Sequence, residues 1–265
     1  MIAGEAPDLA TLEALVERGD VRDRAFVDGA LRLAWARESS PREALTALHD
    51  HLAARALEAH AATRDAIRGG SLRGARLRSH LDALAPELRE HTVEELLGIA
   101  YPPLAEPARE PEIIPYAPSG YAEIVHALDV TGLGEGGVLL DVGAGLGKVV
   151  LLAALLTGAR AIGIERDGPL HRASVDAARA LGLEHDVDLR EGDARVLDAG
   201  DVDVVFMYLP CTGSALEAVL ARLGTRRFRH LCGGSLDLAR HPSLVSIERP
   251  RGWLQIYGRR DALHS

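Results

Sequence analysis

After Gly120 the sequence alternates short apolar segments with amphipathic helical segments, and this alternation constrains the fold more than any other feature. It is typical of a parallel sheet with helices on both faces, because successive parallel strands are joined by helical crossovers. The expected strands are 138–142, 161–165, 187–190, 202–209 and 228–232, and the expected helices are 149–156, 170–181 and 214–223. Two last strands, 244–248 and 253–257, flank Pro250-Arg251-Gly252 as an antiparallel hairpin. The sequence therefore predicts an α/β fold with a doubly wound, seven-stranded, mostly parallel sheet.

The residues before this sheet predict an all-helical N-terminal region, residues 1–100. Ala, Leu, Arg and Glu recur there at helical spacing, and Gly69-Gly70-Ser71 is expected to separate two helices. Six prolines between Tyr101 and Ser119 exclude a helix or a central strand in that stretch. We expect residues 101–119 to be a connector, with Tyr116 either beside the site or part of a stiff link, and residues 120–265 to form the second domain.

Three sequence patterns predict where helices begin. Ser40-Pro41-Arg42-Glu43 and Thr92-Val93-Glu94-Glu95 each place a hydroxyl residue before an acid, as N-terminal caps do. Ser214 and Glu217 have the spacing of a capping box.

Composition narrows the class of protein. The chain has 47% hydrophobic and 26% charged residues and a formal net charge of -9, which fits a folded globular protein and gives no basic footprint for nucleic acid. No apolar run is long enough to span a bilayer, and residues 1–8 lack a signal-peptide pattern, so we expect a cytoplasmic protein. Cys211 and Cys232 are far apart in sequence, and the histidines of residues 1–100 lack ligand spacing, so no metal site is predicted.

A glycine-rich turn is the strongest functional signal. Asp141-Val-Gly143-Ala-Gly145-Leu-Gly147 follows an apolar strand and precedes a helix, so the backbone must turn sharply where a ligand can approach it closely. The pattern is GxGxG rather than the GxGxxG of dinucleotide-binding folds. Asp141 would repel a pyrophosphate and attract the ammonium of a methionine group.

Two further acids follow the next two strands. Glu165 ends the second strand, where a carboxylate can accept hydrogen bonds from both ribose hydroxyls. Glu191-Gly192-Asp193-Ala194 follows the third strand, and there Asp193 can accept from an adenine amino group beside the Ala194 amide.

These motifs resemble those of class I S-adenosylmethionine-dependent methyltransferases, which match VLLDVGAGLG, AIGIE and EGDA in this sequence from about Gly120 onward. The resemblance implies S-adenosylmethionine as cofactor and S-adenosylhomocysteine as product. The cofactor-binding residues it implies are Asp141, Gly143, Ala144, Gly145, Gly147, Lys148, Glu165, Arg166, Gly192, Asp193, Ala194 and Tyr208.

The segment Gly145-Leu-Gly147-Lys148-Val149-Val150-Leu151 is also similar to the cofactor loop of the non-SET histone-lysine methyltransferases. The basic segments and the asparagine-containing acceptor motif of that family are absent, so the likeness extends to the loop alone. Lys148 is the only lysine in the chain. Either its ammonium interacts with a charge on the cofactor or substrate, or it is an exposed residue at the helix start.

The loop after the fourth strand should face the methyl acceptor, because ligands lie beyond the carboxyl ends of the strands. Tyr208 and Thr212 are the candidate catalytic residues, to orient the acceptor or assist proton transfer, although Tyr208 could equally pack beneath the following helix. Cys211 is expected to be a buried filler. The loop lacks the Asn-Pro-Pro-Tyr motif of amino-group methyltransferases, and the acceptor atom stays open.

We expect a small-molecule acceptor, because no basic patch is present. We also expect the helical region to act as a lid or acceptor wall, and it would suit a homodimer. The alternatives are a protein (lysine-type) methyltransferase, a cofactor-binding protein without turnover, an aminopropyltransferase and a nicotinamide-dependent oxidoreductase. The glycine-glycine-aspartate signature of aminopropyltransferases is absent, and Asp141 with GxGxG disfavours the oxidoreductase.

Overall fold

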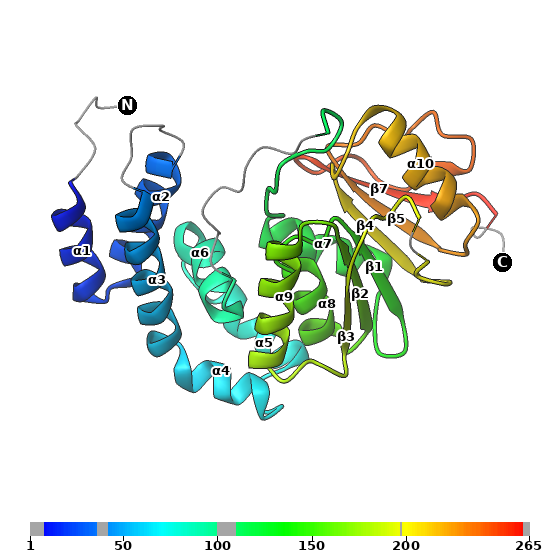
Figure 1. Cartoon of the computed structure of the whole chain (residues 1–265). Coiled ribbons are helices and arrows are strands. Elements are labelled where there is room, and N and C mark those ends of the chain that lie inside the picture. The colour runs from blue at the N-terminus through cyan, green and yellow to red at the C-terminus, as the bar shows by residue number, and fades with distance from the viewer. Residues whose placement is uncertain (1–7, 36–41, 100–109, 197, 262–265) are drawn as a thin grey trace.

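The computed structural model describes residues 8–35, 42–99, 110–196 and 198–261 (Figure 1). Helices α1 to α6 span Leu9–Arg18, Val21–Trp35, Arg42–Ala59, Ala61–Arg68, Gly74–Asp82 and Pro86–Leu97. After them come α7 (Tyr121–Thr131), β1 (Val138–Val142), α8 (Lys148–Thr157), β2 (Arg160–Glu165), α9 (Gly168–Ala180), β3 (Val187–Glu191), β4 (Val204–Tyr208), α10 (Gly213–Gly224), β5 (His230–Gly234), β6 (Leu244–Ser246) and β7 (Leu254–Arg259).

The strands of the described residues form one seven-stranded sheet in the order β3-β2-β1-β4-β5-β7-β6. Strands β1 to β5 pair in parallel, and β7 runs antiparallel to both β5 and β6. The predicted fold class is confirmed, including the C-terminal antiparallel hairpin. The chain order reverses between β1 and β4, where open α/β sheets bind their ligands.

Alternate side chains of each strand pack on opposite faces of the sheet, as the period of two requires. Leu139 of β1 and Phe206 of β4 lie in the cluster shared with α7, α8 and α9, whereas Leu140 and Val205 lie in the cluster shared with α10. Figure 1 shows α10 apart from the other helices of this unit. Both faces of the central strands are therefore buried.

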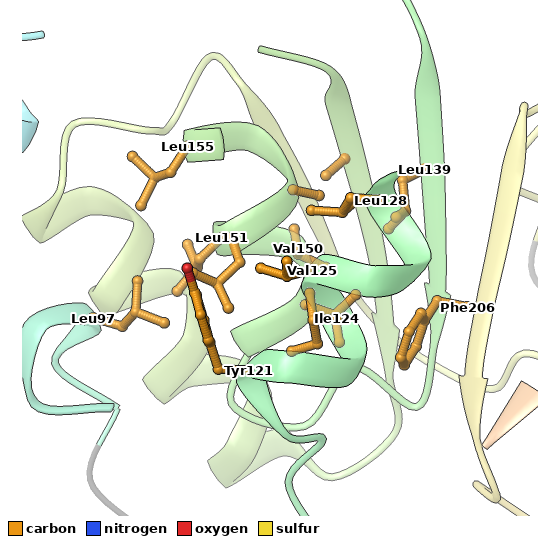
Figure 2. Close-up of a cluster of buried hydrophobic side chains, with 14 of the residues drawn as sticks. Leu97, Tyr121, Ile124, Val125, Leu128, Leu139, Val150, Leu151, Leu155 and Phe206 are labelled. Carbon is orange, nitrogen blue, oxygen red and sulfur yellow. The ribbon is translucent and has the colours of Figure 1, made fainter. Parts of the chain in front are cut away.

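The N-terminal region is helical, as predicted, and its helices use two cores. Side chains from α1, α2 and α3 form a cluster of their own. The buried side chains of α4, α5 and α6 belong instead to the cluster that the sheet shares with α7, α8 and α9. Figure 2 shows Leu97 of α6 beside Tyr121 of α7 and Leu151 of α8. The Tyr121 hydroxyl also bonds the Asp82 carboxylate at 3.0 Å. Helices α4 to α6 thus pack directly against the sheet unit.

The expected break at Gly69-Gly70-Ser71 is confirmed, since α4 ends at Arg68 and α5 begins at Gly74. Ser71 does not cap α5, because its hydroxyl donates to the Ala66 carbonyl at 3.2 Å. The predicted helix start at Thr92 is wrong: Thr92 lies inside α6, which begins at Pro86. Proline at a first helical position is as good a start signal as a hydroxyl cap. Ser40 and Pro41 lie outside the described residues.

Two half-buried histidines of the helical region contact one acid. His60 and His91 each bond the Glu95 carboxylate, at 2.8 and 2.9 Å, and Arg24 bonds both of its oxygens. These contacts hold the pKa of Glu95 far below its usual range although burial raises it. Across the described ranges, no cluster of three or more histidine, cysteine and acidic side chains has metal-binding geometry. In the same ranges, no helix is both long and apolar enough to cross a membrane.

Candidate active site

A cavity of about 340 Å³ opens at the carboxyl ends of β1, β2 and β4. The described part of the proline-rich segment, residues 110–119, supplies much of its wall. The wall residues of this segment are Glu110, Ile113, Ile114, Pro115, Tyr116, Ala117, Pro118 and Ser119. We call residues 110–119 the strap. A cavity of this size suits a single small ligand or cofactor.

The glycines after β1 have backbones that other residues rarely adopt. Gly143, Gly145 and Gly147 have φ angles of 79°, 54° and 81°. A Cβ at Gly145 would lie 2.2 Å from the Tyr116 ring, and one at Gly143 would lie 2.7 Å from the Pro210 side chain. Gly143 and Ala144 line the cavity, whereas Gly145 and Gly147 are not among its wall residues.

Asp141 is the most unusual acid of the cavity wall. Its residue surface is only 4% exposed, and its carboxyl has no hydrogen bond or ion pair to another described residue. Burial, aided by the nearby charge of Glu165, raises the pKa of Asp141 to about 8. A buried carboxyl that faces a cavity and has no partner is suited to a cationic group of a ligand.

Glu165 joins the end of β2 to the glycine-rich turn. One oxygen accepts the Gly145 amide and the other accepts the Asp167 amide, each at 2.7 Å. Burial raises the pKa of Glu165 although both amides lower it. The carboxylate is thereby fixed in the wall, where its remaining lone pairs can accept hydroxyl groups.

The predicted adenine acid, Asp193, lies in the wall within a charged network. The Arg195 guanidinium donates to both Asp193 oxygens, to Oδ1 at 3.0 Å and to Oδ2 at 2.5 Å, and lowers the pKa of Asp193. Glu110 of the strap bonds Arg166 at 2.8 Å and Arg195 at 3.3 Å. Arg166 and Ala194 also line the cavity, whereas Gly192 does not and donates its amide to the Glu165 carbonyl at 2.8 Å.

The two candidate catalytic residues lie in different settings. Tyr208 lines the cavity, and its ring packs against Trp253 with centroids 4.3 Å apart. Thr212 is outside the cavity wall, and its amide donates to the Glu112 carbonyl at 2.8 Å. Cys211 is buried, as expected, and pairs with Ile113 in a short antiparallel bridge. The catalytic roles stay predictions.

Lys148 is buried, so the alternative of an exposed residue at the helix start is wrong. Its side chain is 3% exposed, and its ammonium bonds the carboxylates of Glu90 and Glu94 of α6, the latter at 2.9 Å. Burial lowers the pKa of Lys148 to about 7 and raises the pKa of Glu94. Lys148 also lines the cavity.

Sequence reasoning identified the acids and glycines of the site but did not assign the strap contacts. Glu112 accepts the amides of Ser214 and Ala215, at 3.1 and 2.9 Å, and so caps α10. The predicted capping box of Ser214 with Glu217 is therefore wrong, since the Ser214 hydroxyl donates to Glu112 instead, at 2.8 Å. No spacing rule links residues about a hundred positions apart, and the proline run was the only signal of a segment held in extended form.

No known family matches the chain in a scan of protein families, and a search of curated proteins finds no relative. Solved structures similar to it include an RNA methyltransferase from Salinibacter ruber in complex with S-adenosyl-L-homocysteine. That pair is 24% identical, covers 53% of this chain and 91% of that chain, and has a TM-score of 0.47.

A second similar structure is a methyltransferase from Thiobacillus denitrificans described as dependent on S-adenosylmethionine, also in complex with S-adenosyl-L-homocysteine. It is 21% identical, covers 44% of this chain and 49% of that chain, and has a TM-score of 0.38. The C-terminal domain of precorrin-6Y C5,15-methyltransferase from Rhodobacter capsulatus is 22% identical, with 56% and 94% covered and a TM-score of 0.43. The strand order with a reversed β7 is that of the class I methyltransferase fold.

Proposed function

We propose that this chain is an S-adenosylmethionine-dependent methyltransferase that acts on a small-molecule acceptor. The observation that carries the proposal is the buried Asp141 at the end of β1, whose carboxyl has no partner among the described residues and lies next to a glycine-rich turn and the fixed carboxylate of Glu165. A nicotinamide dinucleotide would place its pyrophosphate at this turn, where the Asp141 and Glu165 carboxylates, when ionised, would repel it.

The cavity residues fit the cofactor group by group. Asp141 would hold the methionine ammonium, and Glu165 would accept the ribose hydroxyls. Asp193 and the Ala194 amide would meet the adenine edge, with Arg195 holding the Asp193 carboxylate in place. The wall residues Cys211, Ala215 and Val219 offer the apolar surface that an adenine ring requires.

When bound, S-adenosylmethionine supplies a methyl group on a sulfonium, which is a good leaving group. The chain must then orient the acceptor and exclude water. The strap and the loop after β4 close the cavity together, because the Ile114 amide donates to the Pro210 carbonyl at 3.2 Å. Tyr208 forms part of the wall on this side, where it would contact the acceptor.

A small acceptor suits the enclosure and the charges of the wall. The basic wall residues are paired: Lys148 with Glu90 and Glu94, and Arg166 and Arg195 with Glu110. Apolar residues of the strap, Ile113 and Ile114 among them, cover much of the remaining wall. An acceptor with a phosphate backbone would find no unpaired cation in this part of the described chain.

Calorimetric titration with S-adenosylmethionine, S-adenosylhomocysteine and NAD tests the proposal. We expect the first two to bind one to one and NAD not to bind. E165Q should weaken binding at least about tenfold, because Gln cannot accept two ribose hydroxyls as well. E191Q is the matched control, since Glu191 is an exposed acid close by that does not line the cavity.

The acceptor class is tested by incubating the protein with methyl-labelled cofactor and a cell lysate divided into small-molecule and protein fractions. We expect label to enter the small-molecule fraction. Label in protein alone would support the lysine-type alternative, and binding without any labelled product would support a protein without turnover.

A further inference from the structure

Lys148 stands at a junction between the helical region and the cavity. It is the first residue of α8, directly after the glycine-rich turn, and its ammonium bonds two acids of α6. Because it is the only lysine in the chain, no other residue offers this compact charge on a flexible stem.

The two acids extend the contact to further elements. The second oxygen of Glu90 accepts the amide of Tyr121 at 2.9 Å, which fixes the start of α7 directly after the strap. Glu94 also bonds Arg32 of α2 at 3.3 Å. One cluster, Lys148, Glu90 and Glu94, therefore joins α2, α6, α7 and α8.

Two of the elements at this cluster, α7 and α8, adjoin segments of the cavity wall. Helix α8 follows the turn that contains Gly143, and α7 follows the strap that contains Tyr116. The turn and the strap contact each other, since the Tyr116 ring lies against Gly145. A shift at the cluster would move both walls of the cofactor cavity.

We propose that Lys148 is a positioning residue, which sets the cofactor cavity by holding the start of α8 and the end of the strap against α6. This inference rests on the proposed function. Lys148 acts through Glu90 and Glu94 rather than as the ligand of a cofactor carboxylate, because two carboxylates already surround its ammonium. The helical region then takes part in cofactor binding without contacting the cofactor.

The test compares K148M with R73M in titrations with S-adenosylhomocysteine, at a temperature where both variants are folded. Arg73 also joins the helical region to the sheet unit, through Asp186 at 2.9 Å and the Gly182 carbonyl at 3.2 Å, but it does not line the cavity. We expect K148M to weaken binding about tenfold or more and R73M to bind as the wild type does. K148M with wild-type affinity overturns the inference, whereas a wild type that does not bind overturns the proposed function instead.

A triple variant separates positioning from charge balance. K148M/E90Q/E94Q leaves no unpaired charge at the cluster, so we expect its Tm to recover relative to K148M. Its affinity for S-adenosylhomocysteine should stay low, because the ammonium that joins α6 to α8 is still missing. Recovery of the affinity together with the Tm would show that charge balance alone matters, and would overturn the positioning role.

Discussion

The Asp141 carboxyl has no hydrogen-bond or ion-pair partner among the described residues. Burying its ionised form therefore destabilises the folded protein. Burial raises its pKa to about 8 from an ordinary value of 3.8. The folded protein therefore binds this proton more tightly than the unfolded chain does. Stability that is present below about pH 4 is lost progressively as the pH rises to about 8. Each pKa unit corresponds to about 1.4 kcal/mol.

D141N should consequently be more stable than the wild type. Asn has nearly the shape of the protonated acid and cannot ionise, so the loss of stability with rising pH disappears. We expect a Tm at least about 2 °C above wild type at pH 8 and little difference at pH 4, measured by calorimetry in the absence of cofactor. A lower Tm for D141N at pH 8 would mean that Asp141 has a stabilising partner.

At the scale of elements, the strap and α10 depend on each other. Glu112 places its carboxylate on the first amides of α10, and the adjacent backbone pairs with residues 210–212. A carboxylate at a helix N-terminus bonds unpaired amides and interacts well with the helix dipole. The contact fixes one end of the strap and the start of the helix at once.

E112A should lower the Tm by about 2–4 °C, because α10 loses its cap. E217A is the comparison, since Glu217 is exposed and belongs to the capping box that the sequence suggested. We expect E217A to leave the Tm within about 1 °C of wild type. A larger drop for E217A than for E112A would restore the capping box in place of the strap contact.

At the scale of the whole molecule, the local sequence pattern predicted the strands of the sheet, but it did not predict the side-chain contacts between distant segments around the sheet. The strands and helices α8, α9 and α10 were predicted because burial on both faces leaves continuous apolar runs, whereas α7 (Tyr121–Thr131) was not predicted. The grouping of the acids at the strand ends could also be predicted, because the topology alone brings the ends of β1, β2 and β3 together. The α6 contact of Lys148 was not predictable, because it joins residues more than fifty positions apart that share no pattern.

The contacts of the strap were likewise not predictable from the local sequence. Its prolines indicated an extended segment, and Tyr116 was considered for the site, but the pairing with residues 210–212 depends on where the loop after β4 lies. The division of the chain at residue 100 stays a prediction, although α4 to α6 share a core with the sheet unit.

The central claim is that Asp141 binds the ammonium of an adenosyl sulfonium cofactor in this cavity. Titration of wild type and D141N with S-adenosylhomocysteine and with its analogue lacking the amino group tests it most directly. The account predicts that the wild type binds S-adenosylhomocysteine at least about tenfold more tightly than the analogue, and that D141N binds the two alike. Equal affinity of the wild type for both compounds, or no binding of either, would contradict it.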